Sequence, residues 1–377
     1  MTQQLSDSFV ERFGKIDDPR RAAGTRYPLI EIIFIAICAI IAGCDDWVAI
    51  ERFGNAKIRW FKQYLPLKHG IPSHDTFGDV FGALDPTQFE EAFIEWMSLI
   101  EVVSGVVALD GKTIRRSFDR TSGKSAIHMV SAWCSMNRLI LGQVKVDNKS
   151  NEITALPKLI RLLTIRGCLV TIDAMGTQID IAKLIIEKEA DYLLSVKLNQ
   201  KHLYEDIEHL FKHATPDNFD VDGFDQAETV EKGHGRIEKR VAYVITHDDW
   251  LDYLRGRHRW AALKTVTKVV RTRTQAGKTS TETQYYIGSR LLSAIDTLAT
   301  VRAHWGVENS VHWVLDVIFN EDNSRVRTGH AQQNLALMRR IAINFLNRET
   351  SRKDSLKGKR QLAGWDETYL EKIVFAN

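Results

Sequence analysis

The stretch "VVALDGKTIRRSF", from Val106 to Phe118, decides how this sequence is interpreted. Its apolar start is typical of a buried β-strand, and Asp110 follows directly. Three basic residues come shortly after this aspartate: Lys112, Arg115 and Arg116. A carboxylate at a strand end with cations behind it suggests a site for a metal ion or a phosphate. Taken alone, Asp110 could simply cap a turn, so its meaning depends on the rest of the chain.

A second apolar run, "GCLVTIDAMGT" (Gly167 to Thr177), also ends on an aspartate, Asp173. Between the two runs, residues 126–146 predict a β-hairpin and residues 151–165 predict a helix. Because a hairpin followed by one crossover can place the first and fourth strands side by side, the two aspartates would share one site. Close carboxylates repel each other and therefore favour a bound cation. Mg²⁺ suits them, because it leaves positions for phosphate and water. The basic residues after Asp110 would then meet a phosphate backbone.

The remaining pattern predicts an α/β fold, a mixed sheet with flanking helices. Helical and β-rich segments alternate up to about residue 213. From about 217 to 290 the helical periodicity is lost, which predicts a β-rich insertion. We expect its strands to pack beside the core instead of extending its sheet. Arg236 and Arg240 would share one face of a strand and contact DNA.

Residues 1–101 predict an N-terminal helical domain, distinct from the α/β unit over 102–377. Within it, "IPSHDTFGDVFGAL" (Ile71 to Leu84) predicts a short amphipathic helix after a Pro-Ser cap. A short helix after a tight turn could be a DNA-recognition helix, or it could belong to a small bundle that contacts no groove. The sequence leaves both interpretations open.

The composition limits the class of protein. The chain has 377 residues, of which 44% are hydrophobic, so a large core is expected. Its net charge is only +3, so local patches would have to bind nucleic acid. Four scattered cysteines without a CxxC pair indicate a reducing compartment. The most apolar run, Leu29 to Cys44, contains Glu31 and is shorter than the ~20 residues that cross a bilayer. We therefore expect a cytoplasmic protein without a membrane partner.

A predicted helix from Ala294 to Phe319 carries Glu308, with His304 and His312 four residues to either side on one face. This face could bind zinc by itself, although the HExxH pattern of metalloproteases is absent. Alternatively, the histidines flank a third carboxylate of the same metal site. We favour the second hypothesis, because two aspartates already supply hard oxygen ligands.

Together these residues resemble the DDE transposases of bacterial insertion sequences. Asp110 in "ALDGKTIR", Asp173 in "TIDAMGTQ" and Glu308 in "HWGVEN" are similar to the three acidic motifs of that family. More narrowly, the chain resembles the group that contains the H-repeat-associated proteins. The likeness covers nearly the whole chain and includes "DPRRAAGTRYPL", "IPSHDTF", "HGRIEKR" and "HWVLDVIFNEDNSRVRTGHAQQNLALMRRIAINFL".

The resemblance implies an RNase H-like catalytic fold interrupted by the β-rich insertion. It also implies Mg²⁺-dependent cleavage of double-stranded DNA at element ends and strand transfer into target DNA, with Mn²⁺ as a substitute ion. Asp110, Asp173 and Glu308 would be the catalytic metal ligands, with Asp110 bridging two ions about 4 Å apart. A homodimer or higher assembly on DNA, associated with the nucleoid, is expected as well.

The chain departs from its relatives around the glutamate. Alignment to the usual Tyr, Arg, Glu, Lys series places Val301, His304 and Leu315 at the tyrosine, arginine and lysine. Arg302 could replace the arginine from one turn away, and His304 is predicted to contact a phosphate, more strongly when protonated. Two other functions remain open: a transposon-derived DNA-binding protein that no longer cuts, and a metal-dependent nuclease without strand transfer.

Overall fold

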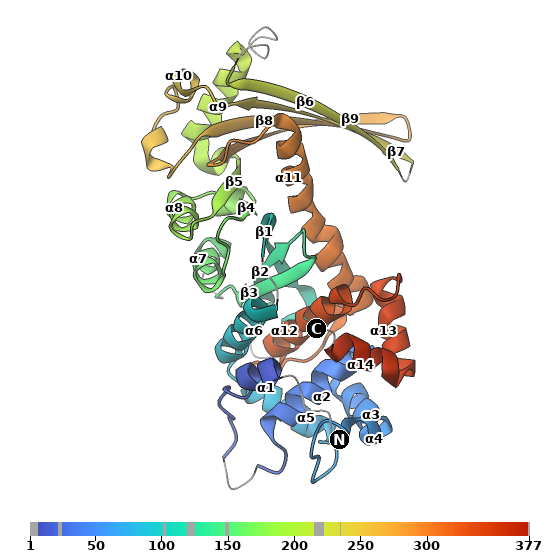
Figure 1. Cartoon of the computed structure of the whole chain (residues 1–377). Helices are drawn as coiled ribbons and strands as arrows, with labels where there is room; N and C mark the ends of the chain where they lie inside the picture. Colours follow the sequence, from blue (N-terminus) through green and yellow to red (C-terminus); the bar gives the residue numbers. More distant parts are fainter. Residues whose placement is uncertain are drawn as a thin grey trace.

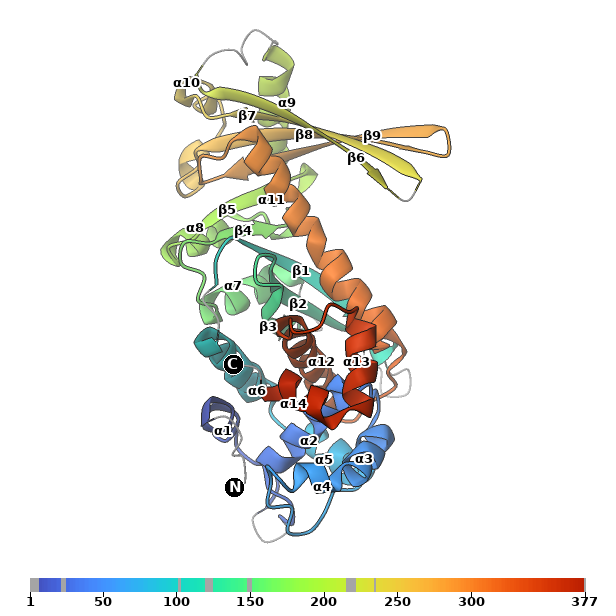
Figure 2. The ribbon, with the colours of Figure 1, turned by 45° about the vertical axis from the view of Figure 1, so that its right-hand side comes forward.

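The computed structural model describes residues 7–21, 25–100, 103–118, 125–147, 151–214, 222–233 and 235–375. The predicted domain boundary at 101–102 and the predicted start of the insertion at about 217 lie outside these residues. The molecule is elongated: helices from both chain ends gather at one end, and the insertion forms a broad sheet at the other (Figure 1). Helix α11 (Ala294–Val307) runs from the insertion toward the helical end (Figure 2).

The helical end combines the two ends of the chain. Its N-terminal part comprises α1 (Asp7–Phe13), α2 (Leu29–Ile41), α3 (Trp47–Ala56), α4 (Ile58–Phe61), α5 (His74–Ala83) and α6 (Pro86–Ile100). Its C-terminal part comprises α12 (Ala331–Arg348), α13 (Leu356–Trp365) and α14 (Glu367–Phe375). Both parts contribute to one hydrophobic core.

Helix α2 lies at the centre of this core. Almost all of its side chains are buried, including Glu31, and the Arg360 guanidinium of α13 donates to the Ile40 carbonyl at 2.9 Å. The apolar run from Leu29 to Cys44 therefore contains a core helix, as its length predicts. Among the described residues, none of the helices combines the length and the apolar character needed to cross a membrane.

Helix α5 packs as part of the bundle. It buries Phe77 and Phe81 against the core, and the Asn334 side chain of α12 donates to the Phe81 carbonyl at 2.8 Å. Its outward face presents Asp75 and Asp79, whose charges would repel phosphate. Of the two interpretations that the sequence left open, this geometry favours the bundle over the DNA-recognition helix.

The other end of the molecule is built on a nine-stranded sheet, in the order β3-β2-β1-β4-β5-β9-β8-β7-β6. Its strands are β1 (Val106–Ile114), β2 (Ile127–Cys134), β3 (Leu139–Lys145), β4 (Leu169–Ile172), β5 (Asp191–Val196), β6 (Phe224–Gly233), β7 (Arg236–Ile245), β8 (Thr265–Gln275) and β9 (Lys278–Gly288). Among the described strands, the pairs β1–β4 and β4–β5 are parallel, and the other neighbouring pairs are antiparallel. The hairpin and the crossover helix predicted from the sequence are confirmed as β2–β3 and α7 (Glu152–Leu162).

Helices cover the sheet and connect its strands. Helix α7 contacts β2 and β3, and α8 (Ile179–Glu187) contacts β5, whereas α11 contacts β1, β4 and the insertion strands. In Figure 1, α7 and α8 lie on the opposite side of β1 from α11. Helix α9 (Lys201–His213) leads into the insertion. The predicted mixed α/β sheet with flanking helices is thus confirmed.

The insertion extends the sheet, so the expectation that its strands pack beside the core was wrong. Strand β9 pairs antiparallel with β5, from Leu193 opposite Gly288 to Val196 opposite Tyr285. Without β9, β5 would be an edge strand with unpaired backbone groups. Strand β9 is the last strand of the insertion before α11, and its pairing with β5 satisfies the backbone groups at the edge of β5.

The position of Asp110 also differs from the prediction. Strand β1 does not end there but continues to Ile114, paired with β2 along this length. What ends is its pairing with β4, whose last parallel pair is Leu109 opposite Ile172. Asp110 and Asp173 each follow directly after this pair, so the two carboxylates lie at the same level of neighbouring strands.

Glu90 supplies a test of the packing between α6 and α12. It is buried and accepts a hydrogen bond from the Gln333 side chain at 3.0 Å. Burial raises its pKa to about 7, so the folded chain retains a proton that the unfolded chain loses above pH 4.5. Its contribution to the free energy of unfolding therefore falls as the pH rises from about 4.5 to 7.

We expect Glu90→Gln to remove this contribution. The variant should match the wild type near pH 4.5 and exceed it by about 2–3 kcal/mol at pH 8. Urea unfolding across this pH range measures the difference. A constant difference at all pH values would contradict the assignment of a buried, protonated Glu90.

Candidate active site

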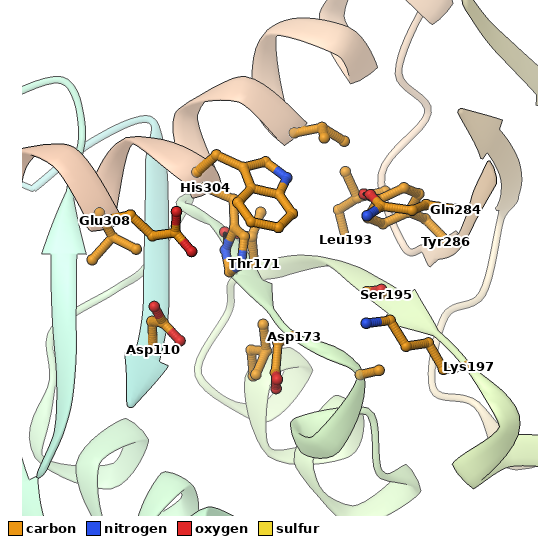
Figure 3. A pocket seen from close by; sticks show the side chains of 15 residues that line it. Asp110, Thr171, Asp173, Leu193, Ser195, Lys197, Gln284, Tyr286, His304 and Glu308 are labelled. Atoms are coloured by element: carbon orange, nitrogen blue, oxygen red, sulfur yellow. Dashed lines mark hydrogen bonds between the residues drawn. The ribbon is translucent and has the colours of Figure 1, made fainter. Parts of the chain in front are cut away.

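The three acidic residues singled out in the sequence line one pocket of about 180 Å³. Asp110 comes from β1, Asp173 from the turn after β4, and Glu308 from the end of α11 (Figure 3). In Figure 3, Glu308 and Asp110 face each other, and Asp173 lies on the same side of the pocket as Asp110. The fold thus brings together three carboxylates that are far apart in the sequence.

Backbone groups orient the two aspartates. Asp110 accepts a hydrogen bond from the Gly111 amide at 2.9 Å. Asp173 caps a short 3₁₀ turn and accepts from the amides of Met175 and Gly176 at 3.1 and 3.3 Å. These bonds leave the second oxygen of each carboxylate able to face the pocket.

Glu308 begins a change in helix geometry. The α-helical part of α11 ends at Val307, and two π-helical segments follow, at Glu308–His312 and Val314–Ile318. Wider helical turns of this kind are rare and occur frequently at functional sites. They displace the residues after Glu308 from the positions that a regular α-helix would give them.

A fourth carboxylate, Glu152, lies beside the trio. It is the first residue of α7, and its Oε1 is 2.5 Å from Nε2 of His128, whose Nδ1 is 2.7 Å from the Thr113 hydroxyl. A Cβ at Gly111 would overlap the Glu152 carboxylate and the His128 ring, so glycine is needed for this arrangement. Sequence reasoning missed Glu152, because it starts a helix and does not follow a strand. Its position after the Asn151 helix cap is the one available signal.

The carboxylates oppose one another's ionisation. Burial raises the pKa of Asp110 to about 7, and the neighbouring charges of Glu152, Asp173 and Glu308 add to the effect. Burial also raises the pKa of Asp173, with a contribution from Glu152 and an opposing one from Lys197. A pocket that gathers several carboxylates with raised pKa values has the donor set and charge that suit a divalent cation.

The carboxylates do not meet at a single point. Within the described part of the chain, no three His, Cys, Asp or Glu side chains lie close enough together to hold a metal ion as they are placed. The residues suit a divalent cation because their donors are carboxylate oxygens and because they line the same pocket. Small side-chain movements would be needed to coordinate it.

His304 does not have the predicted role. Its Nδ1 is 2.9 Å from the Thr171 hydroxyl of β4, and burial lowers its pKa to about 4. The ring is therefore neutral near pH 7, which argues against the predicted phosphate contact that strengthens on protonation. The contact of this ring with β4 depends on the assembled fold, and no local pattern predicts it.

His312 takes a different partner, and this difference argues against a shared zinc site. Its Nδ1 is 3.7 Å from Oδ2 of Asp110, and burial lowers its pKa to about 4 as well. His304 and His312 thus contact separate strands on either side of Glu308. The hypothesis of a self-contained His-Glu-His zinc face gains no support from this geometry.

The burial and ion pairs of Lys112 argue against its predicted contact with DNA. Its side chain is only 7% exposed, and its Nζ lies 2.7 Å from Asp316 and 3.2 Å from Asp322. Two positions after Asp110, it lies on the same face of β1, which the segment after Glu308 covers. Arg115 and Arg116, by contrast, are exposed beyond β1, and the former also contacts Asp322.

Three arginines that were predicted to contact DNA lie near carboxylates of the insertion. Arg240 is largely buried and pairs with Glu238 and Glu231, and Arg302 of α11 also pairs with Glu231. Arg236 is 43% exposed, lies 3.8 Å from Glu238 and shares its face of β7 with Glu238 and Arg240, as its spacing predicts. Arg240 and Arg302 are therefore neutralised by protein carboxylates, and Arg302 points to the insertion and not to the acidic pocket.

The pocket also contains residues that sequence reasoning did not select. Lys197 follows β5, Gln284 and Tyr286 come from β9, and Trp305 lies one turn before Glu308. Figure 3 shows Lys197 across the pocket from Glu308. The cation–π contact of Arg271 with Trp305, at 5.8 Å, links the insertion to this rim.

The geometry of the acidic pocket and the match to known families indicate the same class of protein. A sheet that gathers carboxylates from neighbouring strands and a helix is typical of nucleic-acid-processing enzymes that use divalent ions. Residues 103–345 match the model described as "Transposase DDE domain", and residues 10–97 match "DDE_Tnp_1-associated". The chain belongs to the DDE transposase family.

Several known proteins are similar to this chain, and the first two match nearly its whole length. "Putative transposase YncI" of Escherichia coli O157:H7 is 40% identical over 97% of this chain and 94% of its own. "H repeat-associated putative transposase YhhI" of E. coli K12 is 37% identical over 97% of both chains. The same strain's "Inactive transposase YbfQ" matches 19% of this chain and 84% of its own, at 37% identity. A structure of the piggyBac transposase synaptic complex with hairpin DNA covers 98% of this chain and 79% of its own, with 13% identity and a TM-score of 0.47.

Proposed function

We propose that this chain is an active DNA transposase that cuts the ends of an insertion sequence and joins them to target DNA. The observation that carries the proposal is the convergence of Asp110, Asp173 and Glu308 on one pocket in a chain of this family. The order β3-β2-β1-β4-β5 at the core of the sheet, with three parallel strands, supports an RNase H-like catalytic unit.

Asp110, Asp173 and Glu308 would hold divalent cations, with Glu152 adding negative charge beside them. The family generally uses divalent metal ions, and we propose Mg²⁺, with Mn²⁺ as a substitute, because all the donors are carboxylate oxygens. When bound, such ions polarise a phosphate and activate water or a 3′-hydroxyl. Asp110 would have to release its proton before it could act as a ligand.

Other residues of the pocket would position DNA. Lys197 presents its ammonium group on the rim, where it can bind a backbone phosphate. Gln284 and Tyr286 extend from β9 into the same pocket and can orient the strand that is cut. The DNA path would therefore pass between the acidic residues and the insertion.

The face of the insertion that looks toward α11 would continue this path. The pairing of Arg302 with Glu231 and the stacking of Arg271 on Trp305 identify this face. Arg236 and Arg273 lie on it near the far ends of β7 and β8. Lys239 and Lys268 lie on the opposite face, because each is offset by an odd number of positions from these arginines in the paired strands.

We expect the double variant Arg236→Ala/Arg273→Ala to weaken binding of element ends. Log affinity falls as log salt concentration rises, and loss of two phosphate contacts should make this slope less steep by about 1.8. Lys239→Ala/Lys268→Ala, which removes equal charge from the opposite face, should change the slope little. Equal effects of both pairs in a salt series of binding measurements would remove the α11 face from the DNA path.

Incubation of the protein with labelled element ends and a plasmid target distinguishes the possible functions. Joined products are expected from an active transposase. Products that are only cut would indicate a nuclease without strand transfer, and shifted but intact ends would indicate a DNA-binding protein that no longer cuts. Either of the last two results, in Mg²⁺ and Mn²⁺ alike, would overturn the proposal.

A further inference from the structure

Lys112 connects β1 to the chain that follows Glu308. Its Nζ lies 2.7 Å from Asp316 Oδ1, 3.2 Å from Asp322 Oδ1 and 3.4 Å from Glu321 Oε2. All three carboxylates belong to the segment directly after the catalytic glutamate. A buried ammonium group with three acidic partners is fixed in place, because leaving it without them would expose a charge to an apolar interior.

The network also contacts the neighbouring strand β2. Glu321 is fully buried and accepts a hydrogen bond from Nη1 of Arg340 at 2.9 Å. Nε of Arg340 in turn lies 3.3 Å from the hydroxyl of Ser131, the β2 residue directly opposite Asp110. The segment after Glu308 is thus tied both to the strand that carries Asp110 and to that strand's neighbour.

We propose that Lys112 is a positioning residue, which fixes the Glu308 segment against β1 and so sets the separation of the Glu308 and Asp110 carboxylates. The inference rests on the proposed function, since it concerns the same acidic site. The segment after Glu308 is π-helical, so its path departs from that of a regular α-helix, and the contacts of Lys112 fix this path relative to β1.

A second buried lysine offers a matched control. Lys359 of α13 is also 7% exposed, and its Nζ lies 3.7 Å from the buried carboxylate of Glu349 and 2.9 Å from the Leu346 carbonyl. This pair joins α12 to α13 at the helical end and does not line the acidic pocket. Its loss should destabilise the fold without moving Glu308.

The test compares Lys112→Met with Lys359→Met in the full-length chain. Both variants should unfold at lower urea concentrations than the wild type. Only Lys112→Met should weaken Mn²⁺ binding, by about tenfold, and lower the kcat of end cleavage with the KM for DNA unchanged. Asp316→Asn, which keeps the lysine, should show the same selective loss of kcat. Combining it with Lys112→Met should add little, because both changes break one contact.

Several results would contradict the positioning role of Lys112. A higher KM with unchanged kcat in Lys112→Met would indicate a phosphate contact and overturn the positioning role. Equal losses of Mn²⁺ affinity in Lys112→Met and Lys359→Met would show general destabilisation and overturn it too. If Lys112→Met does not fold, an unchanged kcat in Asp316→Asn overturns it. A wild type that neither binds Mn²⁺ nor cuts would contradict the proposed function itself, and the inference with it.

Discussion

Replacement of Asp110 by asparagine is expected to reduce cleavage of element ends by about 10³-fold or more, while binding of those ends is retained. Asparagine keeps the size of the side chain but cannot supply the negative charge that holds a cation. Asp173→Asn and Glu308→Gln should have effects of the same order. Gel assays of cleavage and of complex formation, run on the same DNA, measure the two properties separately.

The fold should survive the Asp110 change. Since burial raises the pKa of Asp110, its ionised form destabilises the folded chain above pH 7, and asparagine removes that charge. Asp180→Asn, at an exposed position in the first turn of α8, is the matched control and should cut normally. An Asp110→Asn protein that cuts like the wild type would contradict the assignment of the site.

The affinity for Mn²⁺ is expected to depend steeply on pH. With no cation bound, burial and the neighbouring carboxylates raise the pKa of Asp110 to about 7. Below that value a bound ion must displace a proton, so the affinity should rise about tenfold per pH unit up to pH 7 and level off above it. Titration calorimetry from pH 5.5 to 8.5, in two buffers of different ionisation enthalpy, measures both the affinity and the protons released.

Asp110→Asn removes the carboxyl group that titrates near pH 7. The affinity for Mn²⁺ that remains in this variant should therefore depend less on pH. The affinity for Mn²⁺ should rise with pH and not fall. A carboxyl group that must lose a proton before it binds the ion binds more tightly as the pH rises. Affinity that is independent of pH, or that falls between pH 5.5 and 7, would show that Asp110 is not a ligand.

The acidic site could be anticipated because its signals are local. Asp110 and Asp173 each follow an apolar run, and the order of hairpin, helix and strand already favoured the pairing of β1 with β4. Once two strands are parallel neighbours, residues just beyond their last pair must lie close together. Glu308 was found through its resemblance to a family motif, since the helix pattern alone says nothing about which strand it faces.

The errors concern contacts between distant segments. Lys112 looks like a phosphate contact in the sequence, but its partners lie about two hundred residues away, at Asp316 and Asp322. His304 looks like a substitute arginine until β4 supplies Thr171 as its partner. The pairing of β9 with β5 likewise depends on which edge is left open, a property of the assembled sheet.

The central claim is that Asp110, Asp173 and Glu308 together hold the catalytic cation. Anomalous diffraction from a crystal of the protein soaked in Mn²⁺ tests it most directly. An anomalous peak is expected in the pocket, at about 2.1 Å from oxygens of Asp110 and of at least one of the other two carboxylates. A peak on His304 or His312 without Asp110, or active protein whose only bound ion lies outside this pocket, would contradict it.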